Sequence, residues 1–131
     1  MKKTLSFSAT LGVNPGYGHA NENESTVSIV AREWQKAAAE VFQSDKVYVG
    51  AVVKDSKTVY HTEWGCPIGG EATAEISGVC NPEYTDVNQY KEAVVKTLEK
   101  CAKVLCQSTT QVVFNEGDFV YLDFRPKTEN Q

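Results

Sequence analysis

Hydrophobic and polar residues alternate at the start of the chain and then change period. The alternation over residues 4–13 predicts a β-strand, and the Asn, Pro and Gly residues within 14–24 predict a loop. From residue 25 to residue 43, apolar side chains recur every three or four positions, which predicts an amphipathic helix. The chain is therefore expected to begin with a strand, a loop and a helix.

The middle of the chain predicts three strands. Residues 47–53 form a nearly continuous apolar and β-branched run that suits a central strand. Residues 54–57 are polar and predict a short turn, after which residues 58–62 return as a second strand. Residues 72–80 alternate and predict a third strand, which an Asn-Pro pair at 81–82 ends.

The last part of the chain predicts a helix and a hairpin. Asp86 is followed three positions later by a glutamine, which resembles a capping box, and an apolar stripe continues to about residue 107. Residues 111–114 and 119–124 predict two strands. Residues 115–118 between them include a glycine and suit a hairpin loop.

This order of elements favours an α+β fold, a two-layer ferredoxin-like sandwich with two helices on one face of a mostly antiparallel sheet. Residues 1–125 are expected to form a single domain, and residues 126–131 a polar tail. The second face of the sheet has no cover in this arrangement. Because Tyr48, Val52 and Tyr60 would point toward it, we expect a homo-oligomer.

Composition excludes several classes of protein. The 131 residues, 41% hydrophobic and 23% charged, suit one globular domain. Because the start alternates and no long apolar run follows, a cytoplasmic protein without membrane association is expected. A net charge of −4 with two arginines argues against binding a nucleic-acid polymer. Four cysteines without a CxxC pair and two distant histidines favour no metal and no cofactor.

The segment HTEWGCPIGGE at residues 61–71 is the best candidate for a ligand site. An indole offers a flat face to a ring, glycines allow close backbone approach, and carboxylates accept hydrogen bonds. Alternatively, the tryptophan packs over the sheet edge and the glycines only turn the chain. The candidate ligand-binding residues here are Tyr60, His61, Glu63, Trp64, Gly65, Gly70 and Glu71.

A glycine-rich loop at residues 12–18 precedes the first helix. Its spacing matches neither the P-loop nor the dinucleotide fingerprint, and the carboxylates that follow would repel a phosphate. We therefore interpret it as a rim loop, from which Tyr17 or His19 would close over a ligand.

An enzymatic alternative uses His61 and Glu63, which would share one face of a strand, as acid and base. Cys66 lies close enough in the chain to serve as a nucleophile, but no known catalytic signature surrounds it. No catalytic residue is assigned on this basis.

The helix end AREWQKAAAEVF and the strands VYVGAVV and TVYHTEWGCPIGGE resemble small α+β proteins of bacteriophages over residues 5–124. Some phage proteins of this size are oligomeric sponges that sequester nucleotide-derived signals of bacterial defence systems. The resemblance implies a non-enzymatic, anti-defence binding protein of the host cytoplasm that holds a small, ring-containing, nucleotide-derived ligand. The alternatives are the His61/Glu63 enzyme and a structural oligomer without a small ligand.

Overall fold

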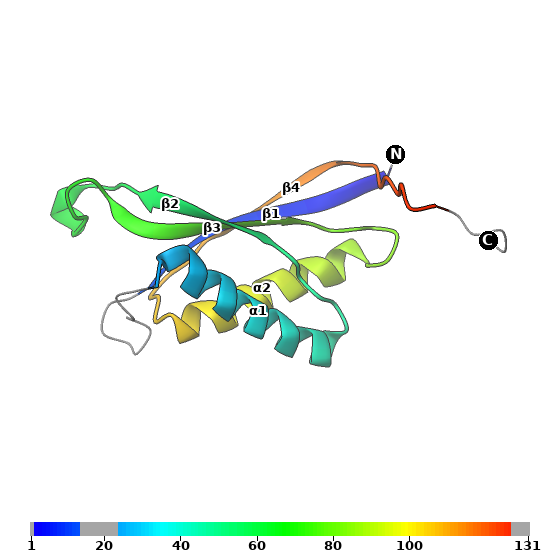
Figure 1. The fold of residues 1–131 in the computed structure, drawn as a ribbon, viewed down its shortest axis with the longest axis horizontal. Coiled ribbons are helices and arrows are strands. Elements are labelled where there is room, and N and C mark those ends of the chain that lie inside the picture. Colours follow the sequence, from blue (N-terminus) through cyan, green and yellow to red (C-terminus); the bar gives the residue numbers. More distant parts are fainter. Residues whose placement is uncertain (1, 14–23, 127–131) are drawn as a thin grey trace.

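The computed structural model describes residues 2–13 and 24–126. They form two layers, a four-stranded antiparallel sheet and two helices that cover one of its faces (Figure 1). The strand order is β2-β3-β1-β4, which confirms the predicted α+β sandwich. In chain order the elements are β1 (Lys2–Gly12), α1 (Thr26–Asp45), β2 (Val52–Thr58), a 3₁₀ helix η1 (Thr62–Trp64), β3 (Glu71–Val79), α2 (Val87–Val104) and β4 (Val112–Phe119).

The core forms where β1 faces the helices. Leu5, Phe7 and the other odd-numbered residues up to 11 are buried, as the alternation predicts. The Phe7 ring stacks on Trp34 of α1 at 5.8 Å between centroids and lies 6.3 Å from the ring of Tyr90 of α2. Burying one such aromatic side chain contributes roughly 1.5–3 kcal/mol. Phe7 therefore joins the sheet to both helices.

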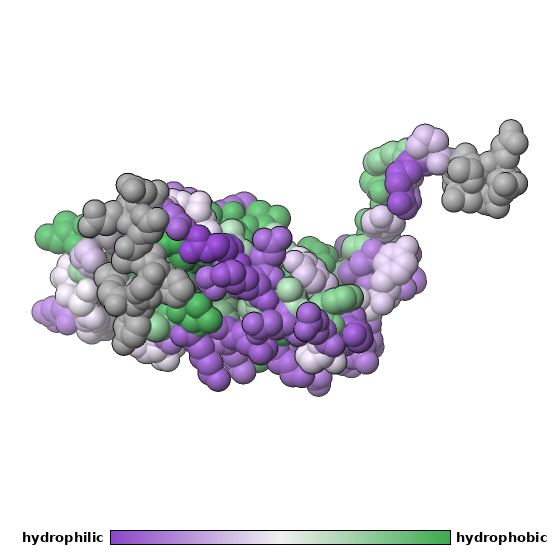
Figure 2. Space-filling model, turned by 60° about the horizontal axis from the view of Figure 1, so that its bottom comes forward, coloured by the Kyte–Doolittle hydropathy of each residue, from purple (hydrophilic) through white to green (hydrophobic). Residues whose placement is uncertain are grey.

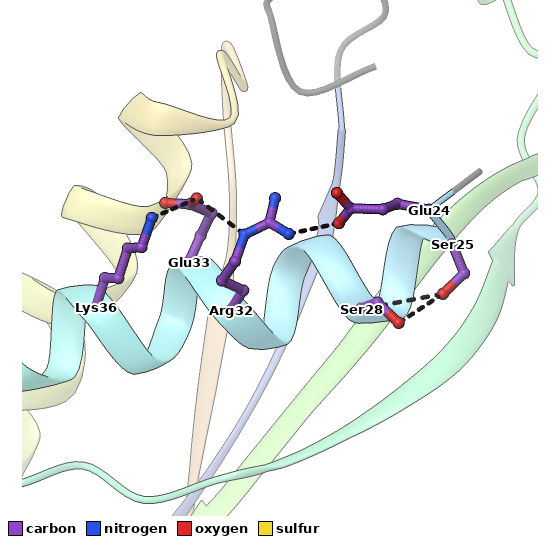
Figure 3. A network of polar contacts seen from close by, with 6 residues as sticks. All are labelled: Glu24, Ser25, Ser28, Arg32, Glu33 and Lys36. Carbon is purple, nitrogen blue, oxygen red and sulfur yellow. Dashed lines mark hydrogen bonds and ion pairs between the residues drawn. The ribbon is translucent and has the colours of Figure 1, made fainter. Parts of the chain in front are cut away.

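The start of α1 is fixed by a cap and an ionic network. The Ser25 side chain accepts the Ser28 N–H at 3.3 Å, which satisfies one of the free donors of the first turn. Glu33 is buried, and Lys36 and Arg32 reach its carboxylate at 3.6 and 3.7 Å, while Arg32 also pairs with Glu24 (Figure 3). The two cations compensate the cost of burying the Glu33 carboxylate.

Both ends of α2 follow recognisable capping chemistry. Asp86 accepts the Gln89 N–H at 3.1 Å, which confirms the predicted start. At the other end, the Gln107 N–H donates to Ala102 O at 2.9 Å, and the residue before it has a positive φ of 57°. This arrangement is a Schellman motif, and it turns the chain away from the helix beside the end of β1.

Residues 47–53 do not form the predicted central strand. Val47 and Val49 are buried because the segment leaving α1 packs irregularly against the core, where Val49 O accepts the Trp34 indole N–H at 3.0 Å. An apolar run signals burial, but the same burial suits a strand or an irregular segment. Only the end of the run, from Val52, belongs to a strand.

The predicted turn at residues 54–57 and strand at 58–62 are also wrong. Residues 54–57 lie within β2, where Asp55 pairs with Ala74 and Ser56 with Thr73. β2 is an edge strand, and charged residues are common there because they oppose pairing with another chain. β2 ends at Thr58, and the chain enters a longer connection, residues 59–70, which we call the β2–β3 turn.

The hairpin loop expected at residues 115–118 is replaced by a continuous strand. Glu116 pairs with Leu5 and Asp118 with Lys3, so β4 runs antiparallel to residues 2–9 of β1. The Lys3 ammonium also reaches Asp118 at 2.7 Å. β4 is the other edge strand of the sheet, which again explains why residues 115–118 are polar. Gly117 does not have the positive φ that a hairpin loop would require.

The open face of the sheet is more polar than expected. Ser6, Ser8 and Ser77 lie on it beside Val52 and Val79, in a shallow hollow of about 610 Å³. The helix side is mostly hydrophilic, and residues 120–126 leave the body as an arm (Figure 2). Tyr48 lies outside the sheet against Phe42, and the homo-oligomer stays a prediction.

Within the described residues, no helix is long and apolar enough to cross a membrane. Both helices instead present one buried and one exposed face, as two-layer packing requires.

Lys46 offers a test of the end of α1. Its φ is 60°, a region that costs a side-chain-bearing residue roughly 1–2 kcal/mol, and its N–H caps Phe42 O. We expect Lys46→Gly to raise the free energy of unfolding by about 1 kcal/mol in urea denaturation. Lys46→Ala is the control, because it removes the side chain and keeps the strain. A glycine variant no more stable than the alanine variant would contradict the assignment.

Candidate functional site

The pairing of β2 with β3 brings Tyr60 and Glu71 together. Thr58, the last residue of β2, pairs with Glu71, the first residue of β3, and Tyr60 follows two positions later. Partial burial raises the pKa of the Tyr60 phenol, and the charge of Glu71 raises it further. Tyr60 is therefore a neutral hydrogen-bonding group beside a carboxylate.

Two cavities meet at Glu71. One, of about 800 Å³, lies among the ends of β1 and α2, the start of α1 and the β2–β3 turn. The other, of about 440 Å³, extends along the sheet from the same point. Both volumes fall in or near the range of small-molecule sites. The described residues that line both are Gly12, Glu71, Gln107 and Thr109.

The electrostatic character of this place follows from its lining. Among the described residues that line the two cavities, Glu71 alone carries a formal charge at neutral pH. The negative end of the α2 dipole and the positive start of α1 both lie at the larger cavity, so the two helix dipoles oppose each other there. The formal charge of Glu71 therefore decides the character of the site, which suits a cationic or neutral polar ligand.

Hydroxyl groups dominate the smaller cavity. Besides the shared residues it is lined by Ser8, Thr10, Thr58, Thr73, Thr110 and Gln111, together with Ala9 and Val113. Such neutral donors and acceptors match sugar hydroxyls and the edges of a purine.

Gln107 ties two walls of the site to each other. Its Oε1 accepts the Gly12 N–H at 3.2 Å, and its Nε2 donates to Leu105 O at 3.2 Å. A Cβ at Gly12 would lie 3.3 Å from the same Oε1, so glycine allows this close contact. The end of β1 is thereby held against the end of α2.

Trp64 and its neighbours lie on η1, outside the lining of both cavities. The Trp64 side chain is 77% exposed, and its ring lies 5.6 Å from that of His61. His61 caps η1, because its Nδ1 accepts the Glu63 N–H at 3.0 Å. Gly65 ends η1 with a φ of 101°. The roles in ligand binding given to these residues remain predictions.

Gly70 has a φ of 89°, and a Cβ there would lie 2.9 Å from Thr58 O. The close approach that this glycine allows is to the end of β2. Tyr17 and His19 lie outside the described residues, so their predicted role as a rim stays a prediction.

Pattern reasoning did not select Thr26, Gln107 and Thr109, which also line the site. Gly12 and Pro67 belong to segments that it did single out, although neither was named as a ligand-binding residue. These residues are distant in the chain, and only the fold gathers them. A polar glutamine directly after a helix end was the one available signal. Among the described residues, no group of three His, Cys, Asp or Glu gathers for a metal.

Comparison with known proteins identifies the family. The model of the SAM lyase family, SAM being S-adenosylmethionine, matches residues 2–123. The chain therefore belongs to the SAM lyase family. No curated protein matches the chain.

Two solved structures are similar. One is a phage SAM lyase in complex with S-methyl-5′-thioadenosine, 13% identical with a TM-score of 0.53, over 86% of this chain and 81% of that chain. The other is the de novo designed protein Foldit4, 12% identical with a TM-score of 0.43, over 90% of this chain and 98% of that one. The phage enzyme has the same fold.

These findings correct the expected function. A non-enzymatic sequestering protein is wrong, because the family is one of lyases and its members are enzymes. The resemblance to phage proteins is supported by the phage SAM lyase of the same fold, whereas the signal-sequestering, anti-defence kind is not. The expected small-molecule ligand agrees with the nucleoside derivative held by that phage enzyme.

The Tyr60–Glu71 interaction can be measured without substrate. Because the Glu71 carboxylate raises the pKa of the Tyr60 phenol, Glu71→Gln should lower that pKa toward its ordinary value. Titration of ¹³Cζ-labelled tyrosine by NMR follows the phenol directly, and Tyr60→Phe assigns its signal. Glu75→Gln, on the same strand, should leave the pKa unchanged. Equal pKa values in wild type and Glu71→Gln would show that the two side chains do not interact.

Proposed function

We propose that this chain cleaves S-adenosylmethionine between its sulfonium sulfur and Cγ of the methionine arm, without water. Membership of the family supports the reaction class. The observation that carries the proposal is a cavity whose only charged lining residue among those described, Glu71, lies beside a phenol kept neutral. Such a site suits a cationic substrate.

The ligand of the phage SAM lyase indicates which bond breaks. S-methyl-5′-thioadenosine is S-adenosylmethionine without its four-carbon amino acid arm. The arm must leave as a species that has formed a new bond of its own, since a lyase adds no water. Its own carboxylate, attacking Cγ, closes a five-membered lactone.

Ring closure accounts for every atom and charge. A carboxylate oxygen forms a bond to Cγ, the electron pair of the Cγ–S bond passes to sulfur, and the sulfonium becomes a neutral thioether. The nucleophile and the leaving group both belong to the substrate, so the enzyme needs neither a nucleophile nor a water. Its contribution is to fold the arm so that the carboxylate lies behind Cγ, which removes entropy from the barrier.

In this proposal Glu71 holds the substrate's ammonium group. The sulfonium charge disappears during the reaction, so a carboxylate paired with it would stabilise the ground state more than the transition state. The ammonium charge persists throughout, and pairing Glu71 with it orients the arm at no such cost. A charged hydrogen bond of this kind is worth about 1.5–3 kcal/mol.

Tyr60 completes the anchor in this proposal. Its phenol keeps its proton at neutral pH because its pKa is raised, so it can donate to Glu71 and accept from the ammonium. The adenosine part then fits the hydroxyl-lined cavity that shares Glu71.

The same comparison supports a setting for the proposed reaction. We place the reaction in the cytoplasm of a phage-infected host, because the solved enzyme of this fold is a phage protein.

Incubating the purified protein with S-adenosylmethionine in H₂¹⁸O tests the proposal. Mass spectrometry should find S-methyl-5′-thioadenosine and, at early times, an unlabelled lactone. Glu71→Gln should reduce the rate roughly 10–100-fold, and Glu75→Gln should react like wild type. Homoserine with ¹⁸O in its hydroxyl group would show attack by water, and no thioadenosine product would refute the activity.

A further inference from the structure

The β2–β3 turn leaves both layers, yet one side chain within it is buried. Most of its residues are exposed, including Val59, Trp64 and Ile68. Cys66 is only 6% exposed, although it is not part of the main core cluster. Burial of a small side chain at the base of an exposed turn indicates a structural contact that holds the turn.

The contacts of the Cys66 sulfur lead to the site. Sγ accepts the backbone N–H of Tyr60 at 3.5 Å, and the thiol donates to Pro67 O at 3.3 Å. Thr58 O lies 3.9 Å from the same sulfur. The sulfur thus connects the backbone of Tyr60, just after the end of β2, with Pro67. Tyr60 and Pro67 both line the larger cavity.

Gly70, near the end of the turn, packs closely against the end of β2. Its φ of 89° and the 2.9 Å that would separate a Cβ at this position from Thr58 O leave no room for a side chain. The backbone around Tyr60 is therefore fixed by two independent features, a sulfur contact and a glycine contact, both directed at the end of β2.

We infer that Cys66 is a positioning residue for Tyr60, holding the phenol beside Glu71 through the hydrogen bond from the Tyr60 N–H to Sγ. Cys66 touches no reacting atom in this role. The inference deepens the proposed function and rests on it where activity is concerned. The position of Tyr60 relative to Glu71 is measurable without substrate.

Cys66→Ala and Cys66→Ser form a matched pair, because alanine and serine are similar in volume and only serine keeps an acceptor. We expect Cys66→Ala to lower the pKa of Tyr60, because the phenol moves away from Glu71 and because the weaker electrostatic effect of Cys66 itself, which also raises this pKa, is lost. It should also reduce kcat roughly tenfold with a smaller effect on KM. Cys66→Ser loses the electrostatic effect of the thiol as well but keeps an acceptor, so it isolates the contribution of position. Cys66→Ser should recover most of both quantities. Cys80→Ala, which removes a buried thiol elsewhere, should lose stability and keep the Tyr60 pKa and kcat.

Gly70→Ala supplies a second route to the same result if Cys66→Ala does not fold. It should shift the Tyr60 pKa in the same direction, because the strained residue displaces the end of β2. Equal Tyr60 pKa values in wild type, Cys66→Ala and Gly70→Ala would overturn the inference, as would a serine variant that behaves like the alanine variant. If wild type does not cleave S-adenosylmethionine, the pKa comparison still decides the positioning role.

Discussion

The register between β2 and β3 is the constraint on which the site depends. Pairing Thr58 with Glu71 brings the carboxylate to the end of the sheet, at the level where Tyr60 leaves β2. β1 and α2 end at the same place. Gln107 connects them, because its side chain accepts the Gly12 N–H at the end of β1 and its own N–H closes the Schellman motif of α2. A register shift of one residue would turn Glu71 to the other face of the sheet. The core around Phe7 holds this frame rigid, because the ring touches both helices from the strand that lies between β3 and β4.

The chemistry proposed for the site asks little of the protein beyond placement and charge. A substrate that contains its own nucleophile and leaving group needs a folded conformation, an anchor for the charge that persists, and no competing base. A single carboxylate beside a neutral phenol provides the anchor. The hydroxyl-rich cavity and the absence of basic residues from the described lining separate this site from phosphate-binding ones. The fold alone would allow either kind of site.

Local patterns predicted the parts of the structure that local physics controls. The alternation of β1, the stripes of both helices and the cap at Asp86 were readable, because burial period and capping act within a few residues. Residues 54–57 and 115–118 misled the prediction because edge strands tolerate polar residues that elsewhere indicate turns. Tyr60 and Glu71 were both named as candidates, but their proximity depends on the register between β2 and β3, which local patterns do not reveal. The position of Gln107 in the site depends in the same way on where α2 ends. Absence of a catalytic signature favoured binding over catalysis, and this was wrong, because the chain belongs to a family of lyases. The ring closure proposed above would need no nucleophile from the protein, so it would leave no such signature in the sequence.

The central claim is that Tyr60 and Glu71 act as one unit, and a double-mutant cycle on the cleavage of S-adenosylmethionine measures this most directly. The rates compared are those of wild type, Tyr60→Phe, Glu71→Gln and the double variant, each with its fold verified by circular dichroism. Groups that act together are non-additive. The double variant should therefore be about as slow as the slower single variant. Effects that multiply, so that the double variant loses the product of both single losses, would contradict a shared role.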